Sequence, residues 1–251
     1  MTTNYHIFNT EDVVKAFEGE LNISSGLTIP ENLSLESVPI SMRHTVLDIG
    51  VGLGRTIGPL STMFEKYVGI DFSAKVIAKA KHLFPGADLR EMDARNLEFA
   101  EKFDCVMFSF NGIDCINFVD RELILRQIRN VLRPGGIFIY STHNLHYSRA
   151  VVWRKTFFVK ELFSSGRLRS ILSIKNRLNL FWRQTQDDKT HVAHINDPAL
   201  SFSILLTYVD IPTEINRLRE CGFETIATIG NTKTASEYND DDCWVYIVAR
   251  N

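Results

Sequence analysis

The sequence predicts an α/β fold: a doubly wound, mostly parallel seven-stranded sheet with a C-terminal antiparallel hairpin and a helical insertion after the fifth strand. Strand-like and helix-like segments alternate up to residue 142, which is typical of parallel sheets covered by helices. A glycine cluster follows the first buried strand. The 251 residues are 45% hydrophobic and 23% charged, so the chain has an ordinary globular composition and is long enough for one well-buried domain.

Apolar runs and turn residues set the expected bounds of the elements up to residue 142. Short apolar or β-branched runs predict strands at residues 45–49, 67–70, 88–92, 103–110 and 137–142. Helical spacing predicts helices at residues 55–66, 74–84 and 120–132. Ser73 and Asp120 are expected to be the N-caps of the second and third of these helices.

The regular alternation stops after residue 142. Between residues 147 and 183 the chain has nine basic residues and one acidic residue, interleaved with aromatic residues. Strand-like residues return near 201–209, and a helix at 212–221 precedes two closing strands at 223–229 and 243–249. We therefore expect one domain with four parts: a helical cap (1–44), a cofactor-binding core (45–142), a basic helical insertion that covers the acceptor (145–200) and closing elements (201–251).

Composition narrows the functional classes. A net charge of −2 does not favour nucleic acid as a partner. The four cysteines form no CxxC pair and no zinc-binding spacing with histidine, so we expect buried thiols and no metal. The first residues lack the features of a signal peptide, and no apolar run approaches the length of a membrane span. These observations predict a cytoplasmic protein.

The glycine-rich turn after the first strand predicts a nucleotide-like cofactor at the carboxyl edge of the sheet. Asp71 lies about 20 residues further on, where a carboxylate can accept both ribose hydroxyls. Arg55 occupies the position where a dinucleotide fingerprint needs a small residue. Asp48 would repel a pyrophosphate but tolerates a cationic sulfonium ligand. The charges favour S-adenosylmethionine over a dinucleotide, and an NAD-dependent oxidoreductase stays an alternative.

Five motifs together resemble the class I S-adenosylmethionine-dependent methyltransferases: VLDIGVGLGR, VGIDFS, the DAR of REMDARNL, FDCVMFSFNGID and VLRPGGIFIYSTHN. They stand in the order of that family and cover about residues 45–142 and the closing hairpin. The resemblance implies S-adenosylmethionine as methyl donor and S-adenosylhomocysteine as product. It implies that the cofactor contacts are Asp48, Gly50, Gly52, Gly54, Arg55, Asp71, Phe72, Asp93, Ala94, Phe110 and Asn111.

Methyl transfer to a hydroxyl needs a base, and histidine is the side chain that titrates near neutral pH. His143 is the first candidate and His146 the second, because both follow the fifth strand at the cofactor edge. Asp114 is a candidate base or acceptor-orienting residue, and the alternative is a cap or a solvated turn. His143 has the alternative role of shaping the loop through a backbone carbonyl. His191 and His194 share one expected helix face but lack a third metal ligand.

The expected reaction is O-methylation of a hydroxyl on a sugar or another small metabolite. The basic segment 147–183 suits a phosphate-bearing or lipid-linked acceptor, peripheral contact with an anionic membrane, or RNA, which the charge of the remaining chain disfavours. A solvated helical lid without a charged ligand is the alternative for this segment. N-methylation of a small amine is the second expected reaction, and a catalytically inactive S-adenosylmethionine-binding partner subunit is the alternative from another class.

Overall fold

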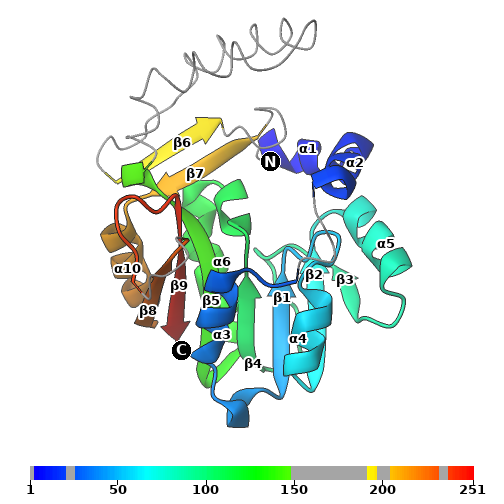
Figure 1. Ribbon diagram of the computed structural model, residues 1–251, viewed down its shortest axis with the longest axis horizontal. Coiled ribbons are helices and arrows are strands. Elements are labelled where there is room, and N and C mark those ends of the chain that lie inside the picture. The colour runs from blue at the N-terminus through cyan, green and yellow to red at the C-terminus, as the bar shows by residue number, and fades with distance from the viewer. Residues whose placement is uncertain (1–2, 21–25, 148–190, 197–203, 232–236) are drawn as a thin grey trace, which may run out of the picture.

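The computed structural model describes residues 3–20, 26–147, 191–196, 204–231 and 237–251 (Figure 1). Its sheet has the strand order β3-β2-β1-β4-β5, and β9 and then β8 continue it beyond β5. The parallel strands are β1 (Thr45–Ile49), β2 (Lys66–Asp71), β3 (Leu89–Glu91), β4 (Phe103–Phe108) and β5 (Leu132–Asn144). β8 (Glu224–Gly230) and β9 (Trp244–Arg250) form the antiparallel pair. The predicted α/β fold class is confirmed.

Two further strands extend this sheet above β5. β6 (Val192–Asn196) pairs antiparallel with β7 (Leu205–Val209), and β7 pairs parallel with the last residues of β5. β9 pairs with one edge of β5 as far as His143, and β4 pairs with the other edge only as far as Tyr140. β7 therefore pairs with β5 on the β4 side, beyond Tyr140. β7 therefore lies above the tip of β4. Figure 1 shows β6 and β7 along the top of the molecule, where the parallel strands end.

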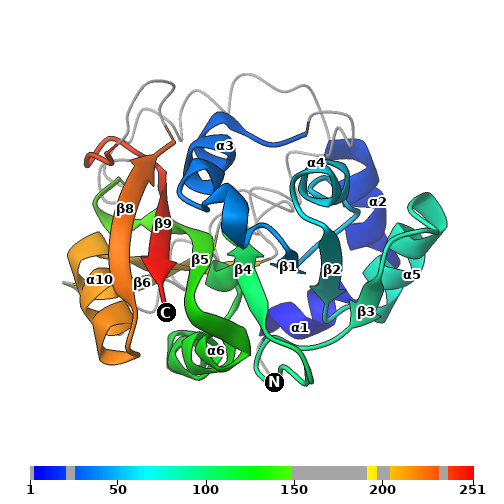
Figure 2. The same cartoon turned by 90° about the horizontal axis from the view of Figure 1, so that it is seen from below.

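Helices cover both faces of the sheet, as Figure 2 shows from below. On one face the core contains apolar residues of α3 (Ile29–Glu36), α4 (Ile57–Met63) and α5 (Ala74–Leu83). On the other face it contains those of α6 (Phe118–Val131) and α10 (Ile211–Glu220). Strands β1 and β4 are buried along their whole length because they have helices on both sides.

The first two helices lie over the carboxyl edge. In α1 (Thr3–Phe8) the Asn4 amide bridges to β7, donating to the Leu205 carbonyl at 2.7 Å and accepting from the Leu205 N–H at 3.0 Å. α2 (Glu11–Glu20) contacts α5 through an ion pair between Glu18 and Lys79.

Three local expectations are wrong. Asn117, and not Asp120, is the N-cap of α6, because its side chain accepts the Asp120 N–H at 2.8 Å. β4 ends at Phe108, because the backbone turns into left-handed conformation at Phe110. Residues 192–196 form a strand where a helical insertion was expected, because they pair with β7.

Most of the expected basic insertion, residues 148–190, lies outside the described residues, as does its expected contact with a membrane or a charged acceptor. Among the residues that the structure does describe, no helix is both long enough and apolar enough to cross a membrane.

Candidate active site

A cavity of about 520 Å³ lies at the carboxyl edge of the parallel strands, with a volume in the range of small-molecule sites. Strand tips, the loops that follow them and α1 form its wall. Most of the predicted site residues line it: Gly50, Gly52, Arg55, Asp71, Phe72, Asp93, Ala94, Phe110, Asn111 and His143. The other predicted site residues, Asp48, Gly54, Asp114 and His146, do not line this cavity.

Glycine conformations shape the loop after β1. Gly50, Gly52 and Gly54 have φ angles of 69°, 56° and 97°, which side-chain-bearing residues rarely adopt. A Cβ at Gly54 would lie 2.5 Å from the Phe84 ring, so this glycine lets the loop pack on the protein. Gly50 and Gly52 instead present their backbone to the cavity.

Asp48 supports this loop from behind. It is buried, and its Oδ2 accepts hydrogen bonds from the Thr56 hydroxyl at 2.5 Å and the Tyr67 hydroxyl at 2.8 Å. Burial raises the pKa of Asp48 to about 6, although both hydroxyl groups lower it. Asp48 therefore acts on a ligand only indirectly, through the loop that it holds.

Asp71 ends β2 and places its carboxylate in the cavity wall. The N–H of Ser73 donates to its Oδ1 at 2.9 Å, and the N–H of Gly52 donates to its Oδ2 at 3.2 Å. Each carboxylate oxygen has a second acceptor site for a ligand hydroxyl. Burial raises the pKa of Asp71 to about 6 against the effect of these donors. Phe72, the next residue, makes an edge contact with the Phe8 ring at 6.0 Å.

Asp93 follows β3 and is held by Arg95. The Arg95 Nη2 lies 2.6 Å from the Asp93 Oδ2, and the Arg95 N–H donates to Oδ1 at 2.9 Å. Burial acts to raise the pKa of Asp93, but the hydrogen bonds from Arg95 hold it below its ordinary value. Asp93 and its neighbour Ala94 line the cavity at the same end as Asp71.

The backbone after β4 is strained where it meets the cavity. Phe110 and Asn111 have φ angles of 54° and 58°, and such conformations cost about 1–3 kcal/mol each in non-glycine residues. The Ser141 hydroxyl accepts the Asn111 N–H at 2.7 Å and helps to hold this conformation. Asn111 Oδ1 is buried and has no hydrogen-bond partner among the residues that the structure describes. Strain and an unpaired polar atom together indicate a place where a ligand binds.

Arg55 was predicted as a cofactor contact, and its guanidinium group is engaged by Glu31. The two Nη atoms of Arg55 lie 2.5 and 2.7 Å from the carboxylate oxygens of the fully buried Glu31. Glu31 also accepts the Thr28 N–H at 2.6 Å and so caps α3. Arg55 still contributes to the cavity wall, with its Cζ 5.0 Å from the centre of the Phe110 ring.

Asp114 and His143 form a buried pair beside the cavity. The distance from Asp114 Oδ2 to His143 Nδ1 is 2.7 Å, and the His143 N–H donates to the same oxygen at 2.7 Å. Asp114 is fully buried, so the expected alternative of a solvated turn is wrong. Because the carboxylate accepts a proton-bearing Nδ1, a neutral His143 has its lone pair on Nε2. Nε2 lies 3.5 Å from the Asn111 Nδ2 in the cavity wall.

Arg121 completes this pair from the core, and sequence reasoning missed it. This fully buried arginine of α6 donates to Asp114 Oδ1 at 2.7 Å, to Glu214 Oε1 at 2.9 Å and to the Thr142 hydroxyl at 3.1 Å. Burial acts to lower the pKa of Arg121, but the two carboxylates raise it above its ordinary value. Arg121 therefore places a permanent positive charge next to the carboxylate that orients His143.

His146 lies away from the cavity. Its Nε2 is 2.7 Å from Oδ1 of Asp210, whose Oδ2 accepts the Thr213 N–H and caps α10. His191 directly precedes β6 and His194 lies within it, so the two histidines are not on the expected helix face. The described residues contain no group of three or more metal-binding side chains.

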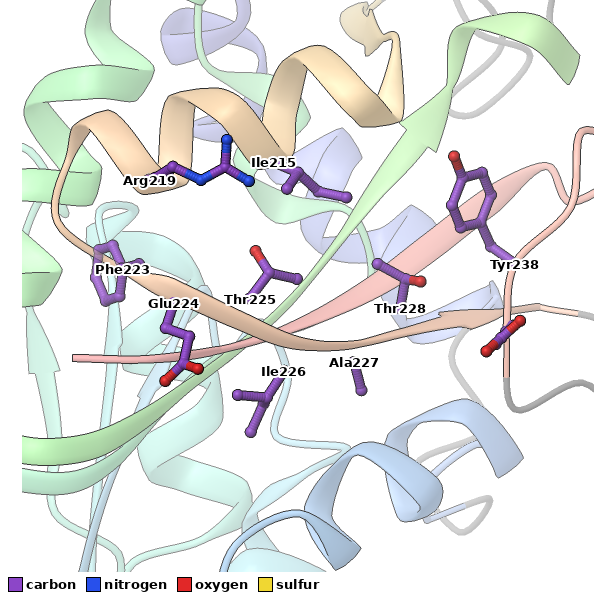
Figure 3. Close-up of a pocket in the computed structure, with 10 residues that line it drawn as sticks. Ile215, Arg219, Phe223, Glu224, Thr225, Ile226, Ala227, Thr228 and Tyr238 are labelled. Atoms are coloured by element: carbon purple, nitrogen blue, oxygen red, sulfur yellow. The ribbon is translucent and has the colours of Figure 1, made fainter.

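A second cavity, of about 670 Å³, lies between α10 and β8 at the edge of the sheet (Figure 3). Figure 3 shows Thr225 and Thr228 pointing toward α10 and Tyr238, and Ile226 pointing the opposite way. None of the predicted site residues lines it. Its larger volume does not make it the active site, because the strained backbone and the ionisable groups described above belong to the first cavity.

Other residues that sequence reasoning missed reach the first cavity from distant segments. Asn4 comes from α1, Leu206 from β7 and Trp244 from the start of β9. Trp244 had a weak signal, because it lies near the start of the predicted closing strand 243–249. Asn4 and Leu206 had no signal, because their positions depend on the packing of α1 and β7 above the sheet.

Comparison with known proteins finds similarity to methyltransferases. Residues 46–136 match the family described as a methyltransferase domain. Phosphatidylethanolamine N-methyltransferase of Cereibacter sphaeroides is 35% identical over 39% of this chain and 50% of its own length. Fatty-acid O-methyltransferase of Mycolicibacterium smegmatis is 27% identical over 49% of each chain. The chain thus spans about half the length of these relatives.

The fold also matches solved structures. An S-adenosylmethionine-dependent methyltransferase from Clostridium acetobutylicum superposes with a TM-score of 0.61 at 13% identity, covering 98% of this chain and 96% of the other. At this identity the likeness describes the fold.

Proposed function

We propose that the protein transfers a methyl group from S-adenosylmethionine to a hydroxyl of a small acceptor, because residues 46–136 match a methyltransferase domain and the fold is similar to that of a solved S-adenosylmethionine-dependent methyltransferase. His143 is the general base and Asp114 orients it. The 2.7 Å contact between Asp114 Oδ2 and His143 Nδ1 carries this proposal, since it presents Nε2 at the cavity.

The residues of the cavity fit S-adenosylmethionine. Asp71 offers acceptor sites for the ribose hydroxyls, and the side-chain-free Gly50 and Gly52 let a ligand approach the backbone. Asp93 and Ala94 line the same end of the cavity as Asp71, where they are available to bind the adenine. Phe72 is available to cover one face of the adenine ring. The unpaired Asn111 Oδ1 is a partner for a donor group on the bound ligand.

The chain's residues have separate tasks in this reaction. When bound, S-adenosylmethionine supplies an electrophilic methyl carbon on a positively charged sulfur. The acceptor oxygen would form its bond to that carbon as the carbon–sulfur bond breaks, with the electron pair staying on sulfur and S-adenosylhomocysteine leaving. His143 Nε2 takes the proton of the acceptor hydroxyl. Asp114 keeps the Nδ1 proton in place, so that Nε2 is the basic nitrogen. We also propose that residues 145–200 cover the acceptor and that the four parts expected from the sequence form one domain.

Replacing Asp71 by Asn is expected to weaken S-adenosylhomocysteine binding about 10- to 150-fold, because lost bonds between a carboxylate and hydroxyl groups cost about 1.5–3 kcal/mol. Isothermal titration calorimetry measures this. Asp88→Asn is the control, since Asp88 is an exposed carboxylate paired with Arg90 outside the cavity. If the wild-type protein does not bind S-adenosylhomocysteine, the proposed function is wrong.

The affinity for S-adenosylhomocysteine is expected to fall with acidity, roughly tenfold between pH 7.5 and pH 5, because the pKa of Asp71 is about 6 and the ribose hydroxyls need the ionised carboxylate. Asp71→Asn should flatten this dependence. The free energy of unfolding of the ligand-free protein changes with pH in the opposite direction. Because folding raises the pKa values of Asp48 and Asp71, the folded state binds more protons than the unfolded state, and its stability rises as pH falls from 6 toward 4. A wild-type affinity that is constant across this range would contradict the role of Asp71.

A further inference from the structure

The order of the strands separates the two ends of the cavity. Asp71 and Asp93 follow β2 and β3, whereas His143 is in β5, with β1 and β4 between. Neighbouring strands are about 4.8 Å apart, so Asp71 and His143 are separated by three such spacings, about 14 Å. If the nucleoside of S-adenosylmethionine binds at the end with Asp71 and Asp93, the acceptor must approach the end with His143.

Apart from Asp114 and Asn111, the side chains that contact the His143 ring are aromatic. His143 pairs in the sheet with Tyr208 of β7 and with Trp244 of β9, and its ring centre lies 4.5 and 6.4 Å from theirs. Ile116 and Leu206 line this end as well. Phe110, which is 57% exposed, presents a further aromatic ring to the cavity.

The cations in the described lining are already paired. Arg55 is held by Glu31, and Arg95 is held by Asp93 and Asp120. The cavity also contains Asp71, which adds negative charge. Among the described residues, therefore, no lining arginine or lysine is left to meet a phosphate, which would lose its water without gaining a partner.

Two polar atoms at this end have bonding capacity for an acceptor. Within the described part of the chain, Asn111 Oδ1 has no partner, and His143 Nε2 has only the long 3.5 Å contact with Asn111 Nδ2. The Asn4 amide is already used by the Cys115 carbonyl and by both backbone groups of Leu205. One hydroxyl fits these atoms. Apart from a contact with the Ser109 hydroxyl, the further hydroxyls of a sugar would meet mainly the aromatic and apolar side chains of the described wall.

We propose that the acceptor brings to this end of the cavity a flat, uncharged aromatic ring with one reacting hydroxyl, as in a phenol or a naphthol. The proposal rests on the proposed function and names its substrate class. The ring packs beside Trp244, Leu206 and Phe110, and its hydroxyl donates to His143 Nε2. A phenolic hydroxyl, with a pKa of about 10, also loses its proton to a histidine far more readily than an alkyl alcohol does.

Calorimetry on the full chain saturated with S-adenosylhomocysteine tests this, with 2-naphthol, 2-naphthyl phosphate and glucose 6-phosphate as probes. We expect 2-naphthol to bind at least about tenfold more tightly than either phosphate, because the cavity offers the phosphates no free cation. Absent binding of 2-naphthol, or a preference for either phosphate, overturns the proposal. A phosphate preference would mean that cations outside the described wall select the acceptor.

Matched variants locate the binding. Leu206→Lys puts a cation at this end and is expected to shift the preference toward 2-naphthyl phosphate. Trp244→Ala removes a ring and is expected to weaken 2-naphthol binding, which keeps the test valid if Leu206→Lys fails to fold. Unchanged 2-naphthol binding by Trp244→Ala contradicts the proposal. The saturation step separates the two hypotheses: failure to bind S-adenosylhomocysteine removes the proposed function itself, whereas normal saturation followed by a phosphate preference removes only the acceptor class.

Discussion

Replacing His143 by Ala is expected to lower kcat for methylation of a hydroxyl by a factor of about 10² to 10⁴, the usual contribution of a general base. Nε2 is the atom lost, and Asp114 cannot replace it because Asp114 is fully buried behind the ring. S-adenosylhomocysteine affinity should change little, since the cofactor contacts lie on β1 to β4. The rate of S-adenosylhomocysteine formation with a phenolic acceptor measures kcat, and calorimetry measures the affinity for S-adenosylhomocysteine, so the two effects can be separated.

His146→Ala is the matched control for this experiment. His146 is three residues further along, but its Nε2 is bound to Asp210 and it does not line the cavity. Its replacement should leave kcat close to that of the wild type. If His143→Ala retains full kcat, no strong base is needed, and N-methylation of an amine becomes the better interpretation. If the wild type binds S-adenosylmethionine but turns over neither hydroxyl nor amine acceptors, the protein is a binding subunit.

The end of the cavity that we propose for the cofactor is lined by residues that the sequence placed together, because it depends on short segments of consecutive residues. Gly50, Gly52 and Asp71 each follow a strand that apolar runs reveal, and parallel strands bring their carboxyl ends to one edge. No long-range information is needed to place them together. Asp48, in contrast, was predicted as a cofactor contact, whereas it is buried behind the loop and bound by the hydroxyls of Thr56 and Tyr67.

The acceptor half depends on contacts between distant segments, and these leave little local signal. β7 joins the sheet above the tip of β4 only because β4 ends before β5 does, and Leu206 follows from that arrangement. Glu31 binds Arg55 from a helix 24 residues earlier in the chain. Neither relation can be deduced from hydrophobic periodicity, which specifies the buried face of an element but not its neighbour.

Arg121 is an intermediate case, because a signal existed and was not used. The buried residues of α6 include Arg121, Ile124, Leu125 and Ile128, so the arginine lies within the apolar stripe of its helix. Glu214 lies in the same way between Ile211 and Leu218 on α10. Charged residues in apolar stripes are rarely buried without a partner. Two such stripes with opposite charges indicate a buried ion pair.

Replacing Arg121 by Met is expected to destabilise the protein by about 3–5 kcal/mol, because two buried carboxylates then lose their shared cation. Arg126→Met is the matched control, since Arg126 is on the same helix but makes an exposed pair with Glu122. Its replacement is expected to leave the free energy of unfolding almost unchanged, because an exposed ion pair contributes little to stability. Urea unfolding of both variants measures the difference.

A second substitution distinguishes the lost charge from lost packing. Adding Glu214→Leu to Arg121→Met removes one of the uncompensated carboxylates, so the double variant should recover part of the lost stability. Asp114 remains without its cation in both variants, and because it holds the Nδ1 of His143, kcat should stay low after stability has recovered. If Arg121→Met is as stable as Arg126→Met, or if Glu214→Leu deepens the loss, the buried ion pair does not stabilise this fold and Arg121 does not support His143 through Asp114.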